Sequence, residues 1–127
     1  MKNLVIVAAA LEIPTGVVLI LAPSYFTWLL FGAEMSGPGE ALAPLGGFAL
    51  LALAVACWPQ RGASGPPASA VRALLAFSLL CAAYLAYRGL TAENTGLLLW
   101  PAAVGHAVLA ILLARPWLGA RHKSTTS

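Results

Sequence analysis

Four long apolar stretches, separated by short polar segments, dominate the pattern of the chain. They cover residues 4–22, 41–58, 69–88 and 96–114. Each is close to the roughly 17 to 25 residues that an α-helix needs to cross a bilayer. A membrane β-barrel would show alternating polar and apolar residues, and residues 50–57 show no such alternation. The pattern therefore predicts an all-α fold with four transmembrane helices.

A shorter segment, residues 23–32, follows the first apolar stretch and is crowded with aromatic side chains. It is too short to cross a bilayer. Tyrosine and tryptophan favour the membrane–water interface, where one edge of the ring stays in contact with water. We therefore expect a short interfacial helix directly after the first transmembrane helix.

Composition supports a membrane location. Of the 127 residues, 61% are hydrophobic and 9% are charged, whereas a soluble domain carries about 25% charged residues. The apolar stretches leave little of the chain for a separate soluble domain. We expect residues 1–127 to form a single transmembrane domain, an up-down four-helix bundle that is embedded in the lipid bilayer.

The basic residues indicate how the chain is threaded through the membrane. Six of the seven fall on one side of the predicted bundle: Lys2, Arg61, Arg72, Arg115, Arg121 and Lys123. The positive-inside rule makes that side cytoplasmic, together with both termini. We expect a multi-pass protein of a bacterial inner membrane. Because this threading and the lipid headgroups account for the positive charge, no nucleic-acid partner is expected.

Aromatic residues near the predicted helix ends support the same threading. Trp28, Tyr87 and Trp100 fall on the predicted outer side, and Trp58 and Trp117 on the inner side. Aromatic side chains gather in such belts at both surfaces of a membrane.

Small residues spaced by four predict close helix packing in the second long stretch. The pairs are Ala43 with Gly47 and Ala52 with Ala56. Such pairs let helix backbones approach closely in lipid. They favour packing between helices, and also assembly into a homo-oligomer or with a larger membrane complex.

Glu12 and His106 are the residues that a functional hypothesis must explain, because each lies near the middle of an apolar stretch. An ionisable side chain at that depth is costly and is often functional. The first and last helices of an up-down bundle are usually neighbours, so we expect the two side chains to meet. Each lies on a face of small residues and should point away from lipid. These faces are Ala8, Glu12 and Gly16 in the first helix, and Ala102, His106 and Ala110 in the last.

Three interpretations of this pair remain open. In the packing interpretation, Glu12 is protonated or hydrogen-bonded to His106, Thr15 or Ser78 and holds the helices together. In the ligand interpretation, it forms a membrane-embedded proton or cation site that binds a small ligand. In the metal interpretation, glutamate and histidine supply half of the ligands, and Cys81 is the only credible addition. Cys57 and Cys81 are otherwise expected to be free, small packing residues.

Motifs of known catalytic chemistry are missing from the sequence, which contains no glycine-rich phosphate loop, CxxC, HExxH or GxSxG. We therefore expect no cofactor. An enzyme that uses Glu12 and His106 as acid and base is an alternative, although no residue identifies a substrate.

The stretch LLFGAEMSGPGEALAPLGGFALLALAVACWP, residues 29–59, resembles small uncharacterised bacterial inner-membrane proteins with four helices that are loosely grouped as DoxX-like. This resemblance implies the layout of the membrane domain and no catalytic residue. Glu12 is also placed like the essential glutamate in helix one of small multidrug resistance transporters, which are of similar length. The expected function is a non-enzymatic packing or accessory subunit, and the alternative is a proton-coupled transporter or ligand binder that uses Glu12.

Overall fold

The computed structural model describes the backbone of residues 1–124 and the side chains of residues 1–116 and of Leu118. Its described part contains five helices: α1 Lys2–Leu21, α2 Pro23–Phe31, α3 Pro38–Cys57, α4 Ala68–Thr91 and α5 Leu99–Ser124. Four of them are long and apolar enough to cross a membrane, namely α1, α3, α4 and the Leu99–Pro116 part of α5. An all-helical fold with four long apolar helices, as the hydropathy pattern predicts, is therefore confirmed.

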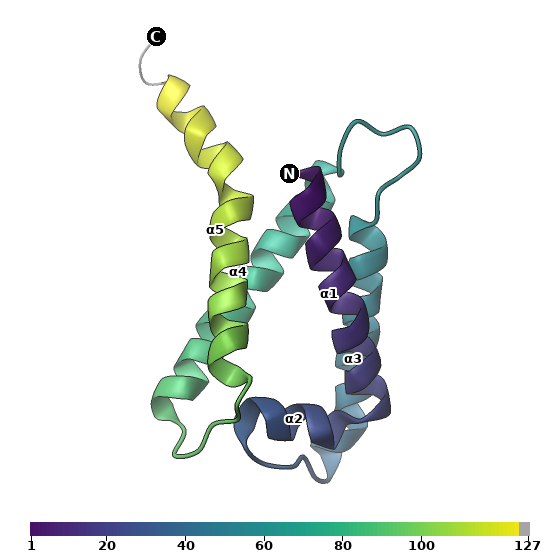
Figure 1. The fold of residues 1–127 in the computed structure, drawn as a ribbon, viewed down its shortest axis with the longest axis vertical. Coiled ribbons are helices and arrows are strands. Elements are labelled where there is room, and N and C mark those ends of the chain that lie inside the picture. Colours follow the sequence, from purple (N-terminus) through teal and green to yellow (C-terminus); the bar gives the residue numbers. More distant parts are fainter. Residues whose placement is uncertain (125–127) are drawn as a thin grey trace.

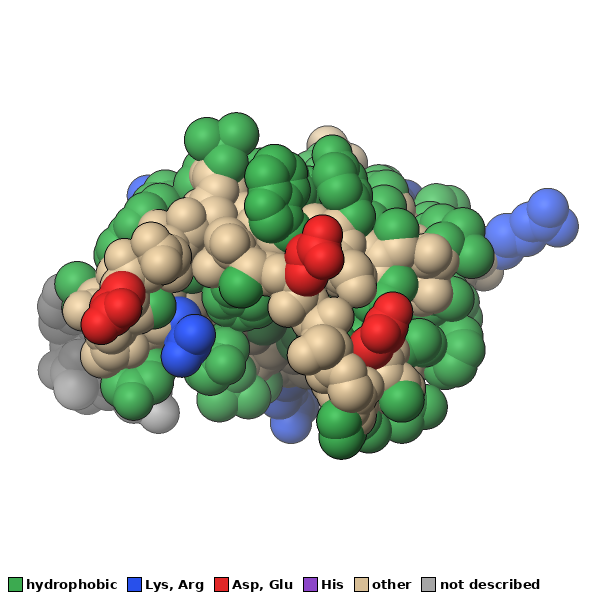
Figure 2. All heavy atoms as spheres, turned by 90° about the horizontal axis from the view of Figure 1, so that it is seen from below, with side chains coloured by type: hydrophobic (Ala, Val, Ile, Leu, Met, Phe, Trp, Pro, Cys, Tyr) green, Lys and Arg blue, Asp and Glu red, His purple; other side chains and the backbone are tan. Residues whose placement is uncertain are grey.

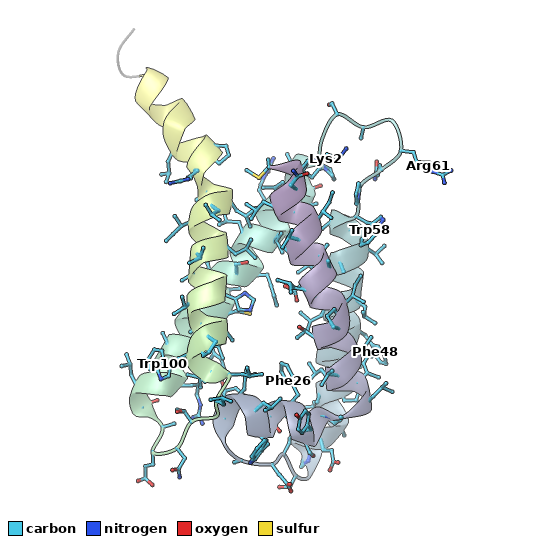
Figure 3. All side chains as sticks on the ribbon, viewed as in Figure 1. Lys2, Phe26, Phe48, Trp58, Arg61 and Trp100 are labelled. Carbon is cyan, nitrogen blue, oxygen red and sulfur yellow. The ribbon has the colours of Figure 1, made fainter. Side chains whose placement is uncertain are left out.

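The long helices alternate in direction and divide the molecule into two ends (Figure 1). We call the end that holds the start of α1 and the end of α5 the terminal end, and the opposite end the α2 end. Lys2, Trp58 and Arg61 lie at the terminal end, whereas Trp100 lies near the α2 end (Figure 3). The side chain of Trp117, predicted to accompany Trp58, lies outside the described residues.

The long helices pack as two pairs, α1 with α3 and α4 with α5. In the first pair, a Cβ added to Gly16 would lie 2.9 Å from the Gly47 carbonyl oxygen, so the two backbones approach closely. Ala43 and Gly47 are both buried, which confirms the packing predicted for them. In the second pair, Gly89 leaves room for the Trp100 ring, which a Cβ would meet at 2.6 Å.

The other small-residue pair, Ala52 with Ala56, does not pack within the described part of the chain, so close packing at this pair stays a prediction about assembly with another helix. Both residues are exposed. The buried side of α3 is instead formed by residues three or four positions apart, which fixes one face of a helix against its neighbours. These residues are Ala43, Gly47, Leu50, Ala54 and Cys57.

Two apolar clusters close the molecule at its two ends. The terminal cluster takes residues from all four long helices: Val5, Ala8, Ala9, Ala54, Cys57, Ala70, Val71, Leu74 and Leu113. The α2 cluster is smaller and takes residues from α2, α4 and α5: Leu30, Leu85, Leu99 and Ala103. The short helix therefore supplies core at one end of the molecule.

α2 is fastened to the loop between α4 and α5 by backbone hydrogen bonds. The Gly96 amide donates to the Leu30 carbonyl at 3.0 Å, and the Leu98 amide donates to the Leu29 carbonyl at 2.8 Å. The guanidinium of Arg88 adds a contact over the Phe31 ring, 5.8 Å from its centroid. Because these amides pair with α2, α5 begins at Leu99 although the apolar stretch predicted from the sequence begins at residue 96.

The prediction that the first and last long helices are neighbours is wrong. The main partner of α1 is α3 and the main partner of α5 is α4, although α1 and α5 both contribute residues to the terminal cluster. At the other end α2 lies between them (Figure 1). A nine-residue helix is about 14 Å long at 1.5 Å per residue, so α2 holds the ends of α1 and α5 apart.

Candidate functional site

Glu12 is buried in the middle of α1, with 6% of its surface exposed. It lies four residues after Ala8 of the terminal cluster and therefore on the same face of the helix. Ala8, Glu12 and Gly16 are all buried, which confirms that this face points into the molecule. The helix continues from Lys2 to Leu21 through Pro14 without a break.

Ser78 occupies the corresponding place on α4. It lies four residues after Leu74 of the terminal cluster and seven before Leu85 of the α2 cluster. The side chain is fully buried, at 0% exposure. Its hydroxyl has no hydrogen-bond partner among the residues that the structure describes. A buried polar group in this state costs about 1–3 kcal/mol of stability.

His106 occupies the corresponding place on α5, between Ala103 of the α2 cluster and Leu113 of the terminal cluster. The side chain is half-buried. Its ring packs edge-on against Phe77, with 5.6 Å between centroids and 80° between planes. Nδ1 of the imidazole is buried and has no hydrogen-bond partner in the described part of the chain.

Glu12, Ser78 and His106 thus lie on three helices at the level between the two apolar clusters, and we call them the polar layer. Apolar side chains on either side lower the local dielectric, which makes an unpaired polar group expensive. Among the described residues, the chain carries this cost at two positions of the layer, Ser78 Oγ and Nδ1 of His106. Helix packing alone does not require polar side chains here.

The hydrogen bonds needed by the packing interpretation are missing from the described part of the chain. Side-chain hydrogen bonds there end on backbone carbonyls, and none joins Glu12 to His106, Thr15 or Ser78. The Thr15 hydroxyl is used within its own helix, where it donates to the Leu11 carbonyl at 2.8 Å. The polar layer therefore holds free hydrogen-bonding capacity.

Cys81 follows Ser78 by less than one turn of α4 and is half-buried. Cys57 is buried in the terminal cluster, where its thiol faces the Ala70 carbonyl at 3.8 Å. Both cysteines are free.

The metal interpretation lacks a ligand set in the part of the chain that the structure describes. No three histidine, cysteine, aspartate or glutamate side chains gather there closely enough to hold a metal ion. Glu12, Cys81 and His106, the residues that the sequence suggests, do not form such a group. The polar layer can thus offer hydrogen bonds and one carboxyl group.

Exposed charges of opposite sign lie at opposite ends of the molecule. Acidic side chains show on the α2 end (Figure 2), where Glu34 and Glu93 lie in loops and Glu40 in the first turn of α3, all exposed. The half-buried Arg88 is a basic residue at the same end, over the Phe31 ring. The exposed basic residues of the terminal end are Lys2, Arg61, Arg72 and Arg115. The side chains of Arg121 and Lys123, predicted to lie on the same side, fall outside the described residues.

The docking of the α4–α5 loop on α2 is the feature that sequence analysis missed. The Gly96 backbone lies so close to Leu29 that an added Cβ would overlap the Leu29 carbonyl group. A glycine at the start of an apolar stretch was the available signal, but it does not identify the partner.

Comparison of this chain with protein-family models, with curated proteins and with solved structures finds no match.

Proposed function

We propose that this chain is a multi-pass protein of a bacterial inner membrane that binds a small hydrogen-bonding ligand or a proton at the polar layer. The observation that carries the proposal is the free hydrogen-bonding capacity beside a buried carboxyl group. Ser78 Oγ and Nδ1 of His106 are buried without partners, and Glu12 is buried at the same level. Binding, and not catalysis, is proposed because no nucleophile or cofactor motif accompanies these groups.

Stability favours the ligand interpretation over the packing interpretation. A polar network that holds helices together gains from its hydrogen bonds, whereas buried groups without partners cost free energy. Proteins tolerate such costs mainly at functional sites. A ligand that forms hydrogen bonds with Ser78 and His106 removes this free-energy cost, and this gain favours binding.

The charge distribution supports a cytoplasmic location for both termini. The terminal end carries exposed lysine and arginine, and the α2 end carries exposed glutamate, as the positive-inside rule expects. Tyr25 and Trp28 of α2 stack at 6.3 Å and are each more than half exposed, which suits an interfacial helix on the outer side. A fluorescent reporter fused to the C-terminus should light up in cells, and a periplasmic phosphatase reporter should stay inactive there.

A stability comparison of two buried hydroxyl groups tests the proposed function. Ser78→Ala removes a hydroxyl without a partner. The free energy of unfolding of the ligand-free protein should therefore stay the same or rise by up to about 1–3 kcal/mol. Thr27→Val is the matched control: the Thr27 hydroxyl is buried and donates within α2 to the Pro23 and Ser24 carbonyls. Loss of the Thr27 hydroxyl should lower the free energy of unfolding by about 0.5–1.5 kcal/mol. Thermal unfolding in detergent measures both.

The packing interpretation predicts the opposite order. If Ser78→Ala destabilises the ligand-free protein as much as Thr27→Val does, the Ser78 hydroxyl is bonded in solution. The polar layer would then have a structural role and the proposed function would be rejected.

The second candidate is the accessory subunit expected from the sequence, and the exposure of Ala52 and Ala56 favours it. A face of small residues that the chain does not cover allows another helix to approach closely in lipid. Ala52→Leu should then weaken association while the monomer stays folded. Gly47→Leu should unfold the monomer, because its side chain would collide with Ile20 and with the backbone of Gly16. Cross-linking in vesicles decides: unchanged association of Ala52→Leu excludes this face.

A further inference from the structure

We infer that the ligand of the polar layer is a neutral, lipid-soluble molecule whose polar group both donates and accepts hydrogen bonds, such as a long-chain alcohol, and that it arrives from the bilayer. This inference rests on the proposed function and adds the chemical class of the ligand and its route. It follows from which sides of the polar layer are closed and from the atoms that the layer leaves free.

The terminal end is closed to water-soluble ligands by the terminal cluster. Four helices contribute to this cluster, and Leu74 and Leu113 within it have no exposed surface. The cavity found at this end is about 10 Å³ in volume and is lined by residues that include Lys2, Val5 and Cys57. A space of that size holds about one water molecule, and no residue of the polar layer lines it.

The α2 end is closed by the α2 cluster and by the backbone pairing of α2 with the α4–α5 loop. A cavity of about 200 Å³ exists there, lined by Trp28, Leu29, Gly32, Thr95, Gly96 and Leu97. It lies at the α2–loop junction and again touches no residue of the polar layer. Neither of these cavities connects water to Glu12, Ser78 or His106.

The remaining approach is sideways, between the two helix pairs. α1 packs mainly on α3 and α5 mainly on α4, and α2 lies between α1 and α5 at one end (Figure 1). The faces that the long helices turn outward near this level are apolar, with Leu11 63%, Val104 59% and Ile111 61% exposed. In a bilayer these side chains contact lipid tails. A ligand on this route passes through hydrocarbon, where a charge costs about 2.5 kcal/mol or more.

The free atoms of the polar layer match a hydroxyl group. The Ser78 hydroxyl can donate and accept hydrogen bonds. Nδ1 of His106 either donates or accepts, depending on the tautomer of the imidazole. The Glu12 carboxyl accepts hydrogen bonds and, when protonated, can also donate one. One ligand hydroxyl can therefore accept from one of these groups while it donates to a second. The Phe77 ring, edge-on to His106, supplies an apolar wall for the attached hydrocarbon chain.

Photolabelling of the purified protein in phosphatidylcholine vesicles tests the ligand class. The probe is dodecanol with a diazirine next to the hydroxyl-bearing carbon, and dodecane with a terminal diazirine is the probe without a polar group. Mass spectrometry should find dodecanol labels on α4 and α5 next to Ser78 and His106. Ser78→Ala should lower this labelling about fivefold, the equivalent of one hydrogen bond.

Thr15→Val is the matched control, because the Thr15 hydroxyl already donates to the Leu11 carbonyl and should not contribute to binding. Labelling of outward residues such as Leu11 and Ile111 by the dodecane probe reports that each variant is folded in the vesicle. Dodecanol labelling that depends on Ser78 and not on Thr15 supports the inference.

Two results would overturn it in different ways. If a photoreactive glycerol labels the polar layer in a Ser78-dependent manner and dodecanol does not, the ligand arrives from water; the inference fails while the proposed function stands. If dodecanol labels no more than dodecane does, the inference also fails. The stability of Ser78→Ala then shows separately whether the proposed function fails with it.

Discussion

The terminal cluster and the α2 cluster close the two ends of the same bundle by different means. At the terminal end the long helices converge and bury one another with side chains such as Ala9 and Leu74, which have no exposed surface. At the α2 end the pairs are apart, and a nine-residue helix fills the space with Leu30 and two backbone hydrogen bonds to a loop. One closure depends on side-chain packing, and the other depends on a separate element that is docked in place.

This difference explains where the polar layer lies. Where the helices converge, small and branched side chains fill the interior and leave no room for polar groups. One turn further, Glu12 and Ser78 are also buried, and the Ser78 hydroxyl has no partner among the described residues. α2 therefore sets the spacing between the helix pairs at the polar layer.

Leu74→Ala should have the largest effect, because Leu74 is fully buried in the terminal cluster. Removing a buried leucine side chain costs about 2–5 kcal/mol through lost contacts and the cavity left behind. Leu80→Ala is the control, since Leu80 is 71% exposed on the same helix and should change stability by less than about 0.5 kcal/mol. If chemical unfolding shows that Leu74→Ala and Leu80→Ala lower the free energy of unfolding equally, the terminal cluster is not the packed end.

Gly96→Ala should have an intermediate effect on the α2 end. The new Cβ would overlap the Leu29 carbonyl, so the loop must move off α2 at a cost of about 1–3 kcal/mol. Hydrogen exchange of the Leu98 amide, which donates to Leu29, should become faster. Gly105→Ala meets no atom within 4 Å and should be neutral or stabilise by up to about 1 kcal/mol. Unchanged exchange at Leu98 would refute the docking.

Arg88→Gln should have the smallest effect of the three. It removes the cation over the Phe31 ring, a contact worth about 0.5–1 kcal/mol at a partly exposed site. Arg72→Gln, an exposed residue of the same helix at the terminal end, should leave the melting temperature unchanged. A loss as large as that of Leu74→Ala would show that Arg88 makes a further interaction.

Much of the fold follows from local pattern. Hydropathy locates the four long helices, and proline with aromatic residues after Ala22 indicates α2. Burial of Glu12 on a face of small residues was also predictable, because Ala8 and Gly16 share that face by helix periodicity. These features depend on residues that are close in sequence.

The spatial relation between helices was not predictable in the same way. Small-residue spacing marks both Ala43 with Gly47 and Ala52 with Ala56, and the pattern alone does not show that the first pair faces α1 and the second is exposed. Likewise, the short helix was expected, but its position between α1 and α5 depends on pairing with a loop more than sixty residues further along the chain. The polar layer is therefore recognisable by residue type, while its lack of internal hydrogen bonds required the structure.

The central claim is that the groups of the polar layer are not bonded to one another in the ligand-free protein. A double-mutant cycle with Glu12→Gln and His106→Gln, measured by reversible unfolding in lipid-like detergent, tests it most directly. Because no hydrogen bond joins the two side chains in the described structure and each of their helices packs mainly on another helix, the two effects should add within about 0.5 kcal/mol. A coupling energy of about 1 kcal/mol or more would contradict the claim and restore the packing interpretation.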